Sequence, residues 1–323
     1  VSAFLLNRSS SQSYLSSWLP TVDGEFVLWI RSRESGRMVL LNDVLGRLPL
    51  YAHTGCSPLG ETVVSRSVQT VAHWIEAHRP DRQAMAETLL FGYPLSSRTL
   101  FEGIRCVAPA TAILPCDHTV TSVMDPLQRS RSSLQRTLNA NAHLLSDRFR
   151  RACERRAAVG ERSILGLSGG LDSRAVLAGL YRSSGADSLH AATFVRSDGS
   201  DTEDATYAES LAGLFEVPWS FFPITSPSVD FQETLLKMKE GLNGLEYSFM
   251  VDFLRRVRLQ FGPDAILFTG DGGDKTIPDL RPAFPLSDAA TFLDHVLRRQ
   301  GQMPLKTAAA VVGIRKTDLA EAI

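Results

Sequence analysis

The chain has 323 residues, of which 44% are hydrophobic and 21% are charged, and its formal net charge is −1. This composition is ordinary for a soluble enzyme, the balanced charge gives no reason to expect nucleic acid or an anionic membrane as a partner, and apolar runs such as Ala265–Phe268 are too short to span a bilayer. The first residues lack the basic lead and apolar core of a signal peptide, and the four cysteines form no CxxC pair, so we expect a cytoplasmic protein with reduced thiols.

The first part of the chain carries mostly β-strand patterns. Glu25–Ile30 and Met38–Asp43 flank a turn and are expected to pair as a hairpin. A second hairpin is expected from Thr111–Leu114 and Thr119–Val123. The apolar residues of Ser67–Ala77 recur at helical spacing, which predicts a helix there.

A polar stretch at Asp125–Asn141 separates this part from a second half in which strands alternate with helices. Strands are expected at Ser163–Leu167, Leu189–Val195, Trp219–Pro223 and Ala265–Phe268. Helices are expected at Ala142–Ala158, Arg174–Tyr181, Asp204–Leu214 and Met250–Leu259. This alternation predicts a parallel sheet with helices on both faces.

The strongest motif is the loop Leu167-Ser168-Gly169-Gly170-Leu171-Asp172-Ser173, which follows the first of these strands and leads into a helix. Ligands of α/β sheets lie at the carboxyl ends of the strands. Gly169 and Gly170 can adopt positive φ and admit a phosphate, while the amides at the helix start and the hydroxyls of Ser168 and Ser173 form an anion cradle. Because a carboxylate repels phosphates, Asp172 implies a bridging Mg²⁺. A plain turn, the competing interpretation, needs one or two glycines and explains neither the serines nor the aspartate.

This loop matches the pyrophosphate loop of the N-type ATP pyrophosphatases, and within that group the chain resembles the asparagine synthetase family. The stretch Thr269-Gly270-Asp271-Gly272-Gly273-Asp274 follows a buried strand where the family has a Gly-Glu/Asp-Gly-x-Asp loop. In the first half, Asp23–Phe26, Asn42–Tyr51 and Thr99–Ile104 resemble the family's glutaminase-like domain.

The resemblance implies a chain of two domains that combines α/β and α+β folds. Residues 1–130 would form a degenerate, inactive glutaminase-like domain of the β-rich Ntn type, with its beginning missing. Residues 131–323 would form a parallel-sheet ATP-pyrophosphatase domain of the adenine nucleotide α-hydrolase-like type, incomplete at its end.

The resemblance also implies an activity, that of an AMP-forming carbon–nitrogen ligase. ATP would bind at Leu167–Ser173, Thr269 and Gly270. Asp172 and Asp274 would hold Mg²⁺ as a substrate carboxylate attacks the α-phosphate and pyrophosphate leaves; an amine would then form the amide and release AMP. Asp271 would have a polar or proton-handling role, unless it merely caps the next segment. Lys275 either faces the substrate as a catalytic residue or is a solvated charge.

The chain departs from asparagine synthetases at two places. No cysteine stands near Val1 to hydrolyse glutamine, and Lys275-Thr276-Ile277 replaces the Glu and Gly-Gly-Tyr that follow Asp274 in the family. Arg174, directly after the first loop, is also less usual in true asparagine synthetases. These departures resemble β-lactam-forming synthetases and the macrolactam cyclases of lasso peptide biosynthesis, in which the substrate supplies the amine. We expect a lasso peptide macrolactam cyclase; the alternatives are a glutamine-hydrolysing asparagine synthetase, a β-lactam synthetase-like enzyme and a non-catalytic peptide-binding relative.

Fewer residues indicate where the acceptor pocket would lie. Glu246-Tyr247 precedes the helix that leads to the second loop, and it either lines the acceptor pocket or is a core tyrosine beside a surface glutamate. The partners that the resemblance implies are a peptide or small-molecule carboxylate substrate, including a precursor peptide with its leader protease.

Overall fold

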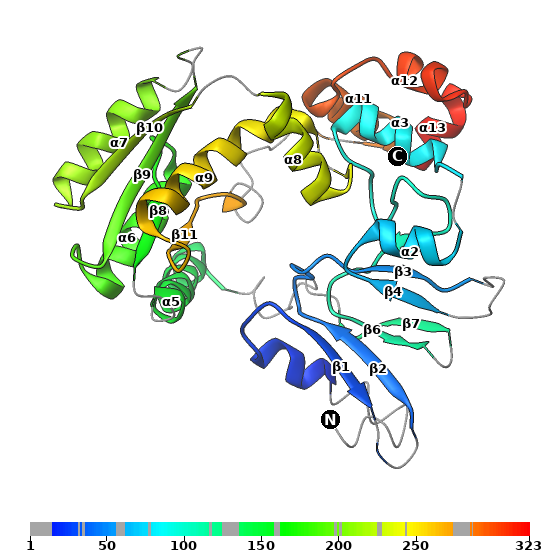
Figure 1. Cartoon of the computed structure of the whole chain (residues 1–323), viewed down its shortest axis with the longest axis horizontal. Coiled ribbons are helices and arrows are strands. Elements are labelled where there is room, and N and C mark those ends of the chain that lie inside the picture. Colours follow the sequence, from blue (N-terminus) through cyan, green and yellow to red (C-terminus); the bar gives the residue numbers. More distant parts are fainter. Residues whose placement is uncertain are drawn as a thin grey trace. The chain divides into compact units, whose positions relative to one another are not determined.

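The chain folds into two compact units, shown in Figure 1. The first unit comprises Val1–Arg129, Lys239–Gly244 and Leu286–Ile323, and the second comprises Ser130–Met238 and Leu245–Pro285. The computed structural model describes residues 15–31, 33, 36–55, 62–76, 79–115, 118–124, 136–157, 162–196, 199, 202–224, 228–242, 244–273, 285 and 287–323.

Two antiparallel sheets form the centre of the first unit. One has the strand order β1 (Val27–Arg31), β2 (Met38–Asn42), β6 (Thr111–Leu114) and β7 (Thr119–Ser122). The other has the order β4 (Val63–Ser65), β3 (Tyr51–His53) and β5 (Arg105–Cys106). Both predicted hairpins are confirmed, since β1 pairs with β2 and β6 pairs with β7 in antiparallel register.

Helices cover these sheets and form a separate cluster. They are η2 (Leu19–Thr21), α2 (Val68–Trp74), α3 (Arg82–Phe91), α11 (Ala289–Gln300), α12 (Leu305–Val312) and α13 (Lys316–Ala322). Helix α2 confirms the helix predicted over Ser67–Ala77, and Ser67 is its N-cap, accepting the N–H of Thr70 at 3.0 Å. Helices α3, α11, α12 and α13 pack their apolar faces together around Leu90 and Leu319.

A short segment from later in the chain, Lys239–Gly244, docks on α2. The carboxylate of Glu240 accepts the N–H of Val68 at 2.5 Å and that of the next residue at 3.3 Å. Two amides at the start of α2 are therefore satisfied by a residue far away in the sequence. Leu242 adds an apolar contact by packing against the cluster that contains Val68.

Four parallel strands form the sheet of the second unit. Their order is β10 (Trp219–Ile224), β9 (Leu189–Arg196), β8 (Ser163–Gly166) and β11 (Ile266–Phe268). Helices α5 (Leu138–Ala157), α6 (Leu171–Ser184) and α7 (Thr202–Leu214) cover one face, where Leu165 and Ala191 are buried. Helix α9 (Phe249–Phe261) covers the other face, where Ile164 and Ala192 are buried. The predicted parallel sheet with helices on both faces is confirmed (Figure 1).

The strand order places a switch point beside β8. The chain passes from β8 to β9 and β10 on one side and later returns to β11 on the other side, by way of α8 (Val229–Lys239), η4 (Leu245–Ser248) and α9. Loops that follow such a pair of strands leave a crevice at the carboxyl edge of the sheet. The loops after β8 and β11 are the two that carry the sequence motifs.

The compact units divide the chain differently from the predicted ranges 1–130 and 131–323. The chain passes from the first unit to the second between Arg129 and Ser130. Leu286–Ile323, which the prediction placed in the second domain, belongs to the first unit because α11, α12 and α13 bury their apolar residues against α3. The glutaminase-like and ATP-pyrophosphatase assignments of the two ranges stay predictions. None of the helices in the described part of the chain is long and apolar enough to cross a membrane.

Replacing Glu240 by Ala removes the acceptor for the N–H of Val68, and we expect the free energy of unfolding to fall by about 1 kcal/mol. Urea denaturation measures this change. Glu233→Ala is the matched control, because Glu233 is an exposed carboxylate of α8 whose ion pair with Lys237 lies on the surface, and it should cost less than about 0.5 kcal/mol. Equal effects of the two substitutions would contradict the docking of Glu240 on α2.

Candidate functional site

The loop after β8 is closed by hydrogen bonds within the motif. The hydroxyl of buried Ser173 accepts the N–H of Ser168 at 3.2 Å and lies 3.0 and 3.1 Å from the carbonyl oxygens of Ser168 and Gly170. The Ser168 hydroxyl accepts the N–H of Gly170 at 3.2 Å. Helix α6 therefore begins at Leu171, inside the motif, whereas the predicted helix begins at Arg174. The two serines fix the path of the loop.

A buried relay holds the start of this loop on the sheet. The hydroxyl of Thr193, on β9, donates to the carbonyl oxygen of Leu167 at 2.8 Å. The indole N–H of Trp219, on β10, donates to the same hydroxyl at 2.9 Å. Three neighbouring parallel strands thus determine where the loop leaves the sheet.

The first turn of α6 is suited to bind an anion. Gly170 is the N-cap residue, with φ −71° and ψ 150°, and no side chain caps the helix. The amides at a helix start point outward and carry a partial positive charge. An uncapped helix start at the edge of a pocket is a ready site for a phosphate or carboxylate group.

The glycines of the first motif provide space rather than unusual backbone angles. Neither Gly169 nor Gly170 has a positive φ, although Gly272 in the second loop has a φ of 88°. A Cβ atom on Gly169 would lie 2.6 Å from Asp204 Oδ1 and 3.2 Å from Tyr207 Cδ2. A glycine is needed at position 169 because helix α7 packs directly against it.

The loop after β11 packs on the first turn of α6. A Cβ atom on Gly270 would lie 2.6 Å from the backbone nitrogen of Ser173 and 2.9 Å from the carbonyl carbon of Asp172. A Cβ atom on Gly273 would fall on the carboxylate of Asp172. The two motifs therefore meet at one place in the fold. Asp274 and Lys275, the predicted metal ligand and catalytic residue, lie outside the described residues.

A cavity of about 520 Å³ lies between these two loops and the carboxyl ends of β8 and β9. The predicted site residues that line it are Leu167, Ser168, Gly170, Asp172, Ser173, Thr269, Gly270 and Asp271. Gly169 and Leu171 are not in the lining, since Gly169 faces α7 and Leu171 is 75% exposed. Most of the residues predicted to bind ATP therefore surround one pocket.

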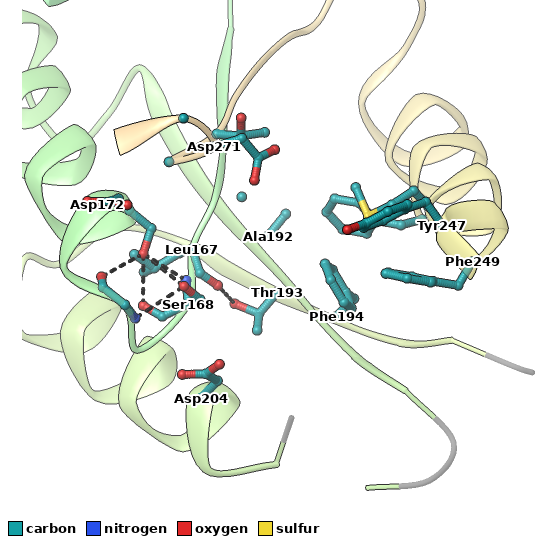
Figure 2. A pocket seen from close by; sticks show the side chains of 18 residues that line it. Leu167, Ser168, Asp172, Ala192, Thr193, Phe194, Asp204, Tyr247, Phe249 and Asp271 are labelled. Atoms are coloured by element: carbon teal, nitrogen blue, oxygen red, sulfur yellow. Dashed lines mark hydrogen bonds between the residues drawn. The ribbon is translucent and has the colours of Figure 1, made fainter. Parts of the chain in front are cut away.

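One wall of the cavity is aromatic and lies on the side away from Asp172, as Figure 2 shows. We call this the aromatic wall; it consists of Phe194, Tyr247, Phe249 and Phe253. The ring centroid of Phe194 lies 5.6 Å from that of Phe249 and 5.1 Å from that of Phe253. Because Tyr247 is 58% exposed and lines the cavity, its interpretation as a core tyrosine is wrong. The side chain of Glu246 lies outside the described part of the structure.

The charged residues of the described lining are all acidic. They are Asp172, Asp204 and Asp271, without any Lys or Arg among the lining residues that the structure describes. Within the described residues, no three acidic, imidazole or thiol side chains gather closely enough to hold a metal ion. Carboxylate oxygens are nevertheless the ligands that Mg²⁺ prefers. The donor set fits a magnesium ion that completes its coordination with phosphate oxygens and water, and the Mg²⁺ site stays a prediction.

Sequence reasoning missed two kinds of residue at this site. Asp204 stands in the first turn of the predicted helix Asp204–Leu214, but its contact with the loop follows from the pairing of β9 with β8, which the sequence does not specify. Thr193 and Phe194 are consecutive residues of β9, so their side chains point to opposite faces of the sheet. The Thr193 hydroxyl is buried, whereas the Phe194 ring belongs to the aromatic wall.

No protein-family model and no curated protein matches the chain. Among solved structures, the glutamine-dependent NAD+ synthetase from Acinetobacter baumannii in complex with ADP matches over 97% of this chain and 80% of its own, at 14% identity and a TM-score of 0.33. The NH3-dependent NAD synthetase from Campylobacter jejuni in complex with the nitrate ion matches over 56% and 87%, at 12% identity and a TM-score of 0.29.

Replacing Gly270 by Ala puts a methyl group against the backbone of Ser173, which cannot move without displacing α6. We expect a loss of about 1–3 kcal/mol in the free energy of unfolding, measured by chemical denaturation. Gly170→Ala is the matched control, because its Cβ would meet only a side-chain atom, the Ser168 hydroxyl at 3.3 Å, and no backbone, with a φ that alanine adopts. It should cost less than about 1 kcal/mol. Equal costs would show that the two loops do not pack as described.

Proposed function

We propose that this protein is an ATP-dependent ligase that adenylates a substrate carboxylate, releases pyrophosphate and joins the activated carboxyl group to an amine. The observation that carries the proposal is the convergence of two motif loops on the uncapped first turn of α6, at the switch point of a parallel sheet. The resemblance of both loops to those of the asparagine synthetase family supports the same chemistry.

The two sides of the cavity fit the two ends of ATP. The triphosphate is assigned to the first turn of α6, whose amides carry the partial positive charge of a helix start. The adenine is assigned to the aromatic wall, since a flat base packs well against aromatic rings. The volume of about 520 Å³ falls in the range of about 300–1,000 Å³ that is usual for small-molecule sites.

Mg²⁺ accounts for the acidic lining. A polyphosphate beside Asp172 and Asp271 would meet uncompensated negative charge, and the described lining offers no cationic side chain against it. We assign the metal to Asp172 and to Asp274 of the second motif. Bound there, Mg²⁺ would stabilise the negative charge of the departing pyrophosphate.

The chemistry proceeds in two displacements. In the first, a carboxylate oxygen of the substrate bonds to the α-phosphorus as the bond from that phosphorus to the bridging oxygen breaks, and pyrophosphate leaves. In the second, the amine nitrogen bonds to the activated carbonyl carbon, AMP leaves and the nitrogen loses a proton. Asp271, exposed in the lining next to Gly270, is assigned to orient the amine or accept that proton.

We assign the amine to the substrate itself, as in a lasso peptide macrolactam cyclase. The replacement of the family's Glu and Gly-Gly-Tyr by Lys275-Thr276-Ile277 favours this assignment. The partners proposed with this assignment are a precursor peptide and its leader protease.

Incubation with Mg²⁺, ATP and a carboxylate substrate should release pyrophosphate and AMP, and Asp172→Asn should lower the rate of pyrophosphate release on the order of 100-fold. The matched control is Asp187→Asn, because Asp187 is exposed just before β9 at the opposite edge of the sheet. A rate that is unchanged in Asp172→Asn, or products that are ADP and phosphate, would rule out this proposal.

The amine source is tested with a candidate precursor peptide and, separately, with aspartate and glutamine. We expect the peptide to lose the mass of one water as AMP forms, measured by mass spectrometry, with no glutamate released from glutamine. Glutamate release coupled to asparagine formation would replace the cyclase assignment by an asparagine synthetase.

A further inference from the structure

We infer that Asp204 is a positioning residue, which clamps the phosphate-binding loop to helix α7 through a hydrogen bond to Gly169. The inference rests on the proposed function of this loop. Oδ1 of Asp204 accepts the N–H of Gly169 at 3.2 Å. Figure 2 shows Asp204 on the opposite side of the loop from Asp172 and Asp271.

Among the N–H groups of residues 168, 169 and 170, only that of Gly169 has a described hydrogen-bond partner outside the motif. The N–H groups of Ser168 and Gly170 are taken by the hydroxyls of Ser173 and Ser168, so both of these bonds are internal to the motif. The N–H of Gly169, between them, is bonded to a carboxylate of another helix. Asp204 therefore ties the loop to α7, whereas the other two hydrogen bonds join residues of the loop to each other.

Tyr207 forms the second half of the clamp. It lies one turn after Asp204 on α7, and its Cδ2 and Cβ atoms would be 3.2 and 3.3 Å from a Cβ on Gly169. The absence of a side chain at Gly169 is what allows both contacts. Asp204 stands in the first turn of α7.

The clamp decides which amides are left for a phosphate group. With the N–H of Gly169 turned toward α7 and those of its two neighbours used inside the motif, a phosphate group would have to bind amides of the first turn of α6. Asp204 does not act as a metal ligand in this account, because its Oδ1 accepts the N–H of Gly169 on the side of the loop away from Asp172 and Asp271 (Figure 2). Its oxygen is required as a hydrogen-bond acceptor.

The test compares Asp204→Ala, which removes the acceptor, with Asp204→Asn, which removes the charge and keeps an acceptor oxygen. Glu203→Ala is the matched control, because Glu203 is an exposed carboxylate in the same turn of α7. The first readout is hydrogen exchange of the peptide that covers residues 167–173 in the full chain without nucleotide. The second is the KM for MgATP and the kcat in the pyrophosphate-release assay.

We expect Asp204→Ala to speed exchange of the loop about tenfold and to raise the KM for MgATP about tenfold, with kcat changed less than twofold. Asp204→Asn and Glu203→Ala should stay within about twofold of the unaltered protein in both readouts. Loop exchange in Asp204→Ala equal to that in Glu203→Ala would overturn the clamp, and so would Asp204→Asn as impaired as Asp204→Ala. Faster loop exchange in Asp204→Ala, in a protein that releases no pyrophosphate with any substrate, would support the clamp and overturn the proposed function.

Discussion

The two-sided pairing of β8 is the constraint on which the site depends. Because β9 lies on one side of β8 and β11 on the other, the loops after β8 and β11 emerge next to each other at the carboxyl edge of the sheet. Segments about 100 residues apart in the chain thereby come into backbone contact, with Gly270 against the backbone of Ser173. Neither loop alone defines a pocket, and the cavity exists because the two meet.

Close packing, rather than unusual backbone dihedral angles, explains why glycines occur at these positions of the loops. Gly270 and Gly273 leave room for the first turn of α6 and for the Asp172 carboxylate, and Gly169 leaves room for α7. Ser173 uses its hydroxyl to close the loop from inside. The residues of the phosphate-binding motif therefore shape the loop. The start of α6, which follows the loop, is the part that can bind an anion.

Much of the second unit could be predicted from the sequence, because its strands and helices alternate with clear apolar patterns and its motif stands at a strand end. The start of α6 was misplaced by three residues, since Leu171, Asp172 and Ser173 belong to the helix although they are part of the loop motif. Neither Gly169 nor Gly170 uses the positive φ that glycine can adopt; steric crowding by α7, invisible in the sequence, is the reason for glycine at position 169.

Contacts between distant segments were beyond sequence reasoning. The docking of Glu240 on α2 and the packing of Leu286–Ile323 with α3 depend on which apolar faces meet in the folded chain, and no local pattern specifies that. The same holds for Asp204 and for Phe194, which reach the site only because β9 pairs with β8. Asp271 was expected near the reacting centre from the resemblance of its loop to that of the asparagine synthetase family, and it lines the cavity.

The central claim is that the two loops bind MgATP with the triphosphate on the first turn of α6, and a crystal structure of the protein with Mg²⁺ and a non-hydrolysable ATP analogue tests it most directly. The account predicts phosphate oxygens within hydrogen-bond distance of the α6 amides, a metal ion bound to Asp172, and the adenine against Phe194 and Phe249. A nucleotide bound elsewhere, or a cavity that stays empty at saturating nucleotide, would contradict it.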